Sequence, residues 1–235
     1  MRDLKKQERI AIEAVAKLFS ATWEKGGDPP DAYITVAGKR IAVDIAALKR
    51  RRASESNTVR ARLRFDKVAT RLIERLQATV GETVPHGTTV LLTITAPIRL
   101  PLKTAAALED KMLNLLGRRS PGRDQKDTIH GNQVRVRLLR SECGPAPKMI
   151  GFVHNSDSDS LLLLNMTCEL LELISDVAGR RAPRGASYRW LVVISVRETS
   201  CLKAYRYIFS QLRMAAGFKK ILMVFGDGRV GILTG

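Results

Sequence analysis

The sequence has few of the residues on which several common kinds of functional site depend. It contains three cysteines, Cys143, Cys168 and Cys201, at wide and irregular spacings. An odd number of distant cysteines predicts neither a disulfide framework nor a zinc cluster, and it is typical of a reducing compartment. The three histidines are equally scattered, and the chain has no HExxH motif, glycine-rich phosphate loop or GxSxG elbow. A catalytic triad is therefore not supported.

Aromatic residues and long apolar stretches are also scarce. Aromatic side chains make up only 5% of the chain, which disfavours a platform of rings for stacking single-stranded bases. No run approaches the roughly 18 consecutive apolar residues of a membrane-spanning helix. The first ten residues, MRDLKKQERI, contain no apolar signal segment. We therefore expect a cytoplasmic protein that does not span a membrane.

Positive charge, in contrast, is abundant. The chain has 40 lysine and arginine residues against 23 aspartate and glutamate residues, which gives a net charge of +17. Such an excess favours a polyanionic partner, most simply nucleic acid, through contacts to phosphate groups. An anionic membrane surface is the competing partner. With 235 residues and 45% hydrophobic content, the chain can form a real core in one large domain or two small ones.

Residues 28–49 form the most informative stretch, because they read as two short strands joined by a tight turn. Residues 32–36 and 40–45 are rich in β-branched side chains, and a turn signal, Ala37-Gly38-Lys39, separates them. This pattern is typical of a β-hairpin.

The length of that turn decides where the two acids at the open end of the hairpin lie. A two-residue turn at Ala37 and Gly38 places Asp31 opposite Asp44, and facing side chains have Cβ atoms about 5 Å apart. A turn at Gly38 and Lys39 still leaves the acids within reach of each other. A three-residue turn would place them on opposite faces of the sheet.

Two carboxylates at such a distance repel each other unless a cation or a shared proton lies between them. Carboxylates are ligands that Mg²⁺ prefers, usually one or two of them together with water and substrate phosphate oxygens. A bound ion of this kind activates water and stabilises the leaving oxygen of a phosphodiester. The pair therefore indicates a metal site for phosphodiester hydrolysis. The alternative is an exposed hairpin end with two solvated acids.

These residues resemble the motif of the PD-(D/E)xK, or restriction-endonuclease-like, nuclease superfamily. That motif has an acid after a proline, here Pro30-Asp31, then a hairpin, and then acid-x-lysine beginning here at Asp44. The family core runs helix, three strands, helix, strand. The resemblance implies that Asp31 and Asp44 hold Mg²⁺ or Mn²⁺ in a DNA hydrolase. Dimers are common in this superfamily, so a homodimer is compatible with the resemblance.

The chain departs from the family at the motif lysine, because Ala46 stands two residues after Asp44. Lys49 and Lys39 are the nearby replacements, and Lys49 is the candidate for orienting water or stabilising charge. If neither replaces the lysine, the resemblance implies a site that has lost its activity.

An amphipathic helix is predicted over residues 4–22, and Glu8 falls on its apolar stripe one turn before Ile12. A charged residue is rarely buried on an apolar stripe unless its charge has a partner. Many members of the resembled superfamily carry a glutamate on the first helix, so Glu8 is a candidate third acid. The alternative is a helix end at which the stripe has already left the core.

Basic residues follow the hairpin directly. Arg50, Arg51 and Arg52 lie in a predicted loop, and a second helix is predicted over residues 58–79. One face of that helix carries a row of cations at spacings of three or four residues, which indicates contacts to the phosphate backbone. The alternative is a solvated surface. The row consists of Arg60, Arg64, Lys67, Arg71 and Arg75.

Further strands and helices alternate to the end of the chain, including a central strand over residues 88–96. We therefore expect an α/β fold with a restriction-endonuclease-like mixed sheet flanked by helices. In this prediction, residues 1–235 form a single domain. Residues 1–96 supply the nuclease-like core, and residues 97–235 form a C-terminal α/β extension that completes the sheet and its helices.

The predicted function is nucleic-acid binding, with DNA favoured over RNA, together with a magnesium- or manganese-dependent nuclease site. Two alternatives remain open: a catalytically inactive nuclease-like protein that binds DNA or RNA, and a basic subunit that assembles with acidic partners.

Overall fold

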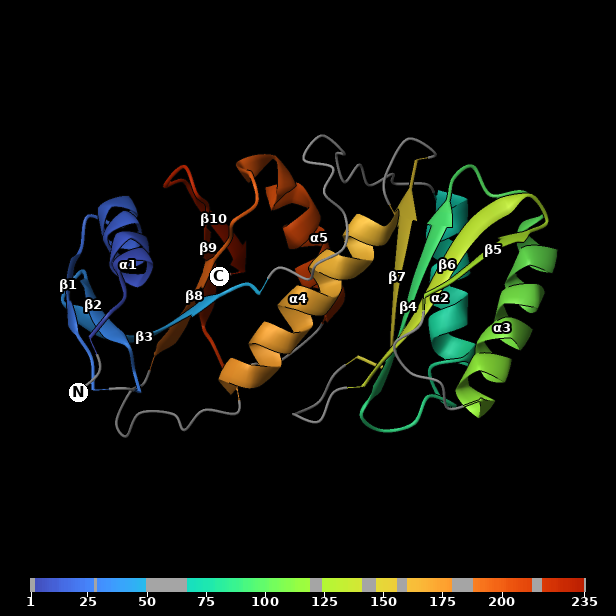
Figure 1. Ribbon diagram of the computed structural model, residues 1–235, viewed down its shortest axis with the longest axis horizontal. Helices are drawn as coiled ribbons and strands as arrows, with labels where there is room; N and C mark the ends of the chain where they lie inside the picture. Colours follow the sequence, from blue (N-terminus) through green and yellow to red (C-terminus); the bar gives the residue numbers. More distant parts are fainter. Residues whose placement is uncertain are drawn as a thin grey trace. The chain divides into compact units, whose positions relative to one another are not determined.

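The structure is a computed structural model, and it divides the chain into two compact units. Unit 1 consists of Met1–Arg51, Glu169–Phe209 and Ala215–Gly235, and unit 2 of Arg52–Cys168 and Ser210–Met214. Figure 1 labels the helices and strands along the chain. The structure describes residues 3–27, 29–49, 67–118, 124–140, 147–155, 160–178, 188–212 and 217–234.

Unit 1 is built on a sheet with the order β1-β2-β3-β8-β9-β10. The first three strands form an antiparallel meander, β8 and β9 continue the sheet parallel to β3, and β10 closes it antiparallel to β9. The strands span β1 (Thr22–Lys25), β2 (Ala32–Val36), β3 (Lys39–Ala47), β8 (Arg189–Ile194), β9 (Lys220–Val224) and β10 (Val230–Thr234).

Helices cover both faces of this sheet (Figure 1). The helix α1 (Lys6–Leu18) packs Ile12 and Val15 against one face. The other face carries α5 (Leu202–Leu212), which follows a short 3₁₀ turn (Thr199–Cys201), and the unit 1 part of α4 (Ser160–Ala178). Successive side chains along a strand point to opposite faces of the sheet. Each side chain of β2 and β3 therefore points either to the α1 face or to the α4 face.

The hairpin of β2 and β3 has the predicted two-residue turn. Val36 pairs with Lys39 and Ile34 pairs with Ile41. Ala37 and Gly38 both have positive φ angles, +47° and +75°. Positive φ at both central residues defines the type I′ turn, which matches the twist of two paired strands. The register that places Asp31 opposite Asp44 is thereby confirmed.

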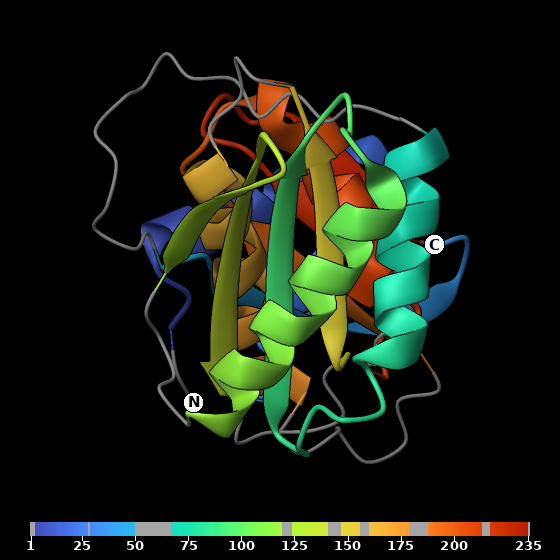
Figure 2. The ribbon, with the colours of Figure 1, turned by 90° about the vertical axis from the view of Figure 1, so that its right-hand side faces the viewer.

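Unit 2 has a four-stranded sheet with the order β5-β6-β4-β7. Its helices α2 and α3 lie side by side over one face of this sheet (Figure 2). The helix α2 approaches Gly151 of β7 so closely that a Cβ atom added to this glycine would lie 2.4 Å from the Ile73 side chain. The elements span α2 (Lys67–Thr79), β4 (Thr88–Thr95), α3 (Pro101–Gly117), β5 (Gln125–Ile129), β6 (Asn132–Arg140) and β7 (Met149–His154).

The predicted α/β class agrees with these two mixed sheets, but the expected single domain with a core in residues 1–96 does not. The predicted strand 88–96 exists as β4, and it pairs with β6 and β7 in unit 2 rather than with the hairpin. The strand that extends the hairpin is β8, which pairs with β3 in parallel. Strand partners depend on long-range packing, and no local pattern in the sequence specified them.

Helix boundaries also differ from the prediction. The first helix ends at Leu18 instead of residue 22, because Thr22 begins β1. The second predicted helix is described only from Lys67 onward, as α2. Among the described residues, no helix has both the length and the apolar character that crossing a membrane requires.

Candidate functional site

The hairpin brings the two predicted acids together on one face of the unit 1 sheet. Ala32 pairs with Val43, so the register places Asp31 beside Asp44, one step toward the open end. Ala32 and Val43 belong to the core under α1. Their neighbours Asp31 and Asp44 therefore project to the opposite face. Both acids are buried, with Asp31 6% and Asp44 0% exposed.

Each carboxylate accepts a defined hydrogen bond. The backbone N–H of Ile45 donates to Oδ2 of Asp31 at 2.7 Å. The guanidinium of Arg189 donates from Nε to Oδ2 of Asp44 at 2.5 Å. The other oxygen of Asp44, Oδ1, is buried and has no hydrogen-bond partner in the described part of the chain. A buried carboxylate oxygen without a donor is a costly arrangement, so this atom is a candidate ligand for a cation.

Arg189 is the cation that the sequence analysis missed. Besides Asp44, its Nη2 donates to the backbone oxygen of Val177 at 3.4 Å, and its Cζ lies 4.6 Å from the centroid of the Phe218 ring. Arg189 is the first residue of β8, 145 positions along the chain from Asp44. Only the parallel pairing of β8 with β3 brings it there. The one local signal is its place at the start of a strongly β-prone run.

The structure does not bring the two lysine candidates to the acids. Leu48 donates its N–H to Ile194, so the chain remains extended after β3 and moves Lys49 farther from Asp44 by about 3.3 Å per residue. Lys49 is exposed. Lys39 lies at the turn, at the other end of β3. The side chain of Ala46 leaves the position of the motif lysine without a charge.

Glu8 is buried at 9% exposure, as its place on the apolar stripe predicts. Its Oε2 accepts the backbone N–H of Lys5 at 2.8 Å, which satisfies a free donor at the start of α1. The interpretation that the stripe has left the core at this point is wrong. Glu8 does not join the acid pair, however, because no three His, Cys, Asp or Glu side chains in the described ranges are grouped closely enough to hold a metal.

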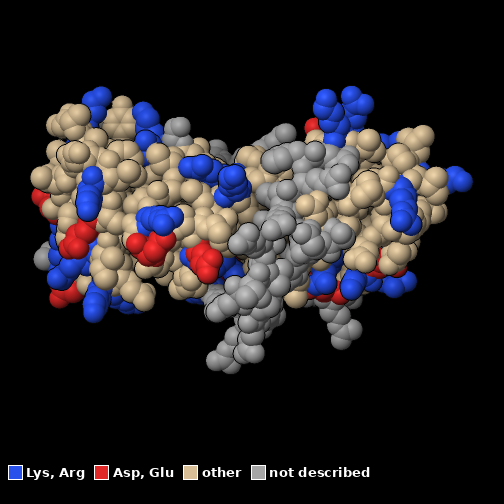
Figure 3. Space-filling view, turned by 90° about the horizontal axis from the view of Figure 1, so that it is seen from above, with Lys and Arg blue, Asp and Glu red and all other residues tan. Residues whose placement is uncertain are grey.

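The predicted phosphate contacts are described only in part. Arg50, Arg51, Arg52, Arg60 and Arg64 lie outside the described residues. Lys67, Arg71 and Arg75 are exposed along α2, one turn apart, while Ala69, Leu72 and Ile73 are buried on the other side. This helix belongs to unit 2, whereas the acids belong to unit 1. Figure 3 shows Lys and Arg spread over one face of the molecule.

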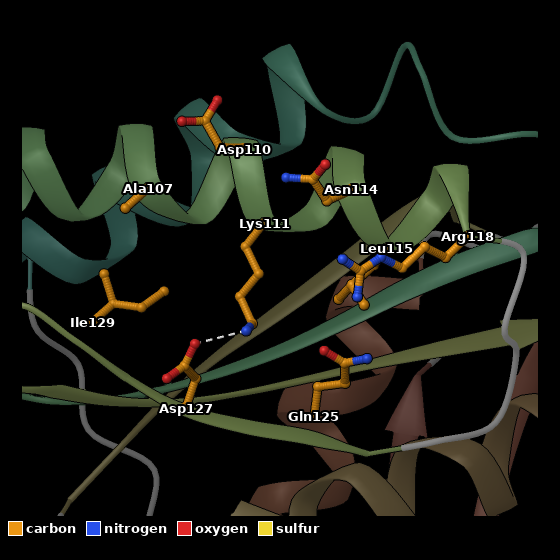
Figure 4. Close-up of a pocket in the computed structure, with 9 residues that line it drawn as sticks. All are labelled: Ala107, Asp110, Lys111, Asn114, Leu115, Arg118, Gln125, Asp127 and Ile129. Carbon is orange, nitrogen blue, oxygen red and sulfur yellow. Dashed lines mark hydrogen bonds and ion pairs between the residues drawn. The ribbon is translucent and has the colours of Figure 1, made fainter.

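A separate open pocket of about 450 Å³ lies between α3 and β5 of unit 2 (Figure 4). Lys111 from α3 points across it toward Asp127 of β5, and the two form an ion pair at 2.7 Å. The Lys111 ammonium holds the pKa of Asp127 below its usual range. Asp110 and Arg118 also line the pocket. Because both charges occur in equal number, the pocket has no evident preference for an anion or a cation.

Comparison with known proteins identifies no relative, because no family model, curated protein or solved structure matches the chain.

Proposed function

We propose that the protein binds nucleic acid and that Asp31 and Asp44 form a metal-dependent site for hydrolysing phosphodiester bonds. The observation that carries this proposal is the hairpin register, which sets the two acids side by side on one sheet face. DNA is the favoured substrate, as the resemblance to the PD-(D/E)xK superfamily implies.

The order of elements in unit 1 supports the same proposal. Unit 2 interrupts unit 1 after β3, and the chain returns to unit 1 within α4. When the interruption is left out, unit 1 runs α1, β1, β2, β3, α4, β8. This order is helix, three strands, helix, strand, which is the family core. In this interpretation, α4 and β8 take the roles that the sequence analysis gave to the second helix and β4.

The donor set suits a hard divalent cation. Asp44 offers the oxygen Oδ1, which has no hydrogen-bond donor in the described part of the chain, and Asp31 adds a second carboxylate. Two carboxylates with water and phosphate oxygens form a common Mg²⁺ environment. When bound, such an ion supplies Lewis-acid stabilisation and an activated water. Asp31 and Asp44 would hold it, while the Ile45 N–H fixes the orientation of Asp31.

The proposed nucleic-acid binding is supported by the charge of +17 and by the exposed face of α2 with Lys67, Arg71 and Arg75. Lysine and arginine side chains in such a row contact phosphates and position the strand without reading its sequence. Binding should therefore be strong at low salt and should weaken steeply as salt is added.

A plasmid-nicking assay tests the proposed activity. Supercoiled DNA is incubated with the protein in Mg²⁺ or Mn²⁺, and Asp31→Asn is compared with the wild type. The asparagine keeps an oxygen that accepts the Ile45 N–H, so the fold should survive while the ligand charge is lost. Asp227→Asn, at an exposed acid far along the chain from the pair, is the control. Nicking that disappears only in Asp31→Asn supports the proposal, and equal nicking in all three proteins contradicts it.

A second candidate function, a non-catalytic nucleic-acid-binding protein, is favoured by two observations at the same site. Ala46 replaces the motif lysine, and Arg189 already neutralises Asp44. Salt-sensitive DNA binding without nicking in either metal would select this function. Failure to bind DNA or RNA at low salt would instead leave a basic subunit that assembles with acidic partners.

A further inference from the structure

A group of lysines and aromatic rings stands at the amino ends of the parallel strands β8 and β9 in unit 1. We call it the lysine–aromatic cluster, and it consists of Phe19, Tyr188, Trp190, Lys219 and Lys220. The Nζ atom of Lys219 lies 4.1 Å from the centroid of the Tyr188 ring. The Nζ atom of Lys220 lies 5.0 Å from the Phe19 ring and 5.2 Å from the Trp190 ring.

The sheet brings these residues together from three distant segments. Parallel strands begin at the same edge of a sheet, and here Trp190 of β8 is the register partner of Lys220 of β9. The N–H of Lys219 donates to the oxygen of Arg189 at 2.8 Å, which continues the pairing beyond the strand. Phe19 follows the last residue of α1, and its ring lies 4.9 Å from that of Trp190.

The cluster carries positive charge that no acid of the described residues neutralises. Neither Lys219 nor Lys220 forms an ion pair with a carboxylate in the described ranges, whereas Lys25 and Lys111 each do so. An aromatic ring attracts an ammonium group through its quadrupole but has no net charge to cancel it. The rings therefore hold two ammonium groups in place and leave their charge available. Lys219 is exposed, and Lys220 is half-buried.

We propose that the lysine–aromatic cluster binds the phosphodiester backbone of nucleic acid. The inference rests on the proposed nucleic-acid binding and adds to it a surface on unit 1, the unit that carries the acid pair. Ammonium groups are common phosphate ligands, and each one that meets a phosphate releases condensed counterions, which favours binding at low salt. The rings are buried or half-buried, so they offer little apolar surface for insertion into a membrane.

The test compares two double variants that remove the same charge. Lys219→Gln/Lys220→Gln changes the cluster. Lys39→Gln/Lys103→Gln changes two exposed lysines that form no ion pair in the described residues. The affinity of each protein for a short DNA duplex is measured over a range of salt concentrations. The logarithm of the binding constant falls linearly with the logarithm of the salt concentration, and each lost phosphate contact makes this fall less steep by about 0.9. For the cluster variant, the steepness of that slope should therefore decrease by about 1.8, and binding at low salt should be roughly tenfold weaker. The control variant should stay close to the wild type.

Lys219→Arg/Lys220→Arg keeps both charges and should restore the slope, which separates loss of charge from loss of fold. The inference is overturned if the cluster variant and the control bind DNA equally well. It is also overturned if the cluster variant keeps DNA binding and loses only binding to vesicles containing phosphatidylserine. If the wild type itself does not bind DNA or RNA at low salt, the proposed function fails, and this inference fails with it.

Discussion

At the scale of single residues, the ion pair between Asp44 and Arg189 dominates the candidate site. The side chain of Asp44 is 1% exposed and that of Arg189 9% exposed, so water screens neither charge. Removing one partner of a buried pair leaves the other charge uncompensated, which typically lowers stability by about 3–5 kcal/mol. The pair is therefore a requirement of the fold as well as a feature of the site.

Replacing Arg189 tests this conclusion. Arg189→Gln should lower the free energy of unfolding by about 3–5 kcal/mol, measured by urea denaturation. The double variant Arg189→Gln/Asp44→Asn should recover part of that loss, because it leaves no buried charge behind. A single variant as stable as the wild type would show that the two groups are not paired in solution.

A second set of buried polar side chains surrounds Tyr205 on α5. Glu169 accepts two hydrogen bonds from Nη2 of Arg197, at 2.9 and 3.0 Å. The hydroxyl of Tyr205 has no hydrogen-bond partner among the described residues, although Arg197, Glu169 and Ser195 lie around it. Burial raises the pKa of this hydroxyl well above its ordinary value. The folded protein therefore keeps Tyr205 neutral at a pH at which the unfolded chain ionises it.

The sign of the resulting pH dependence follows from this shift. Below about pH 10, the ordinary tyrosine pKa, both states are neutral and Tyr205 adds no pH dependence. Above that pH the unfolded chain loses the proton first, so the free energy of unfolding falls as pH rises. Tyr205→Phe should remove this part of the alkaline loss, and it should change stability at pH 7 by no more than about 1 kcal/mol. An unchanged alkaline loss in thermal unfolding from pH 9 to 11 would contradict the account.

At the scale of elements, the type I′ turn of the β2–β3 hairpin sets the register of the acid pair. Its first central residue, Ala37, has a φ of +47°, a conformation that side chains other than glycine, asparagine and aspartate rarely adopt. Asn-Gly is the preferred pair at these positions. The hairpin therefore forms with a strained alanine at its tip.

Ala37→Asn should relieve that strain and raise the free energy of unfolding by about 0.5–1 kcal/mol, measured by urea denaturation. Ala47→Asn is the matched control, because Ala47 is exposed in β3 and has no positive φ. Asparagine is unfavourable in strands, so the control should not gain stability. A loss of stability in Ala37→Asn would argue against the type I′ turn and against the register derived from it.

The sequence allowed the elements near the acids to be predicted better than their partners. The turn signal Ala37-Gly38 and the β-branched runs beside it are local, so the hairpin and its register could be derived. The pairing of β3 with β8 and the place of β4 in a second sheet depend on packing between distant segments. The same limit explains why no local pattern predicts that Arg189 pairs with Asp44.

At the scale of the whole molecule, unit 1 has the element order helix, three strands, helix, strand, and unit 2 is inserted within it. The insertion separates β3 from β8 in the sequence, so these paired strands are not consecutive elements of the chain. The net charge of +17 belongs to the whole chain. It supports the proposed nucleic-acid binding.

In the proposed site, Asp31 and Asp44 share one divalent ion. Electron paramagnetic resonance of Mn²⁺ measures this directly, because free Mn²⁺ gives a strong signal that bound Mn²⁺ loses. Titration of the wild type should reveal one bound ion for each chain, and Asp31→Asn should weaken that binding at least tenfold, while Asp227→Asn should leave it unchanged. Mn²⁺ binding that is absent from the wild type, or equal in all three proteins, would contradict the account.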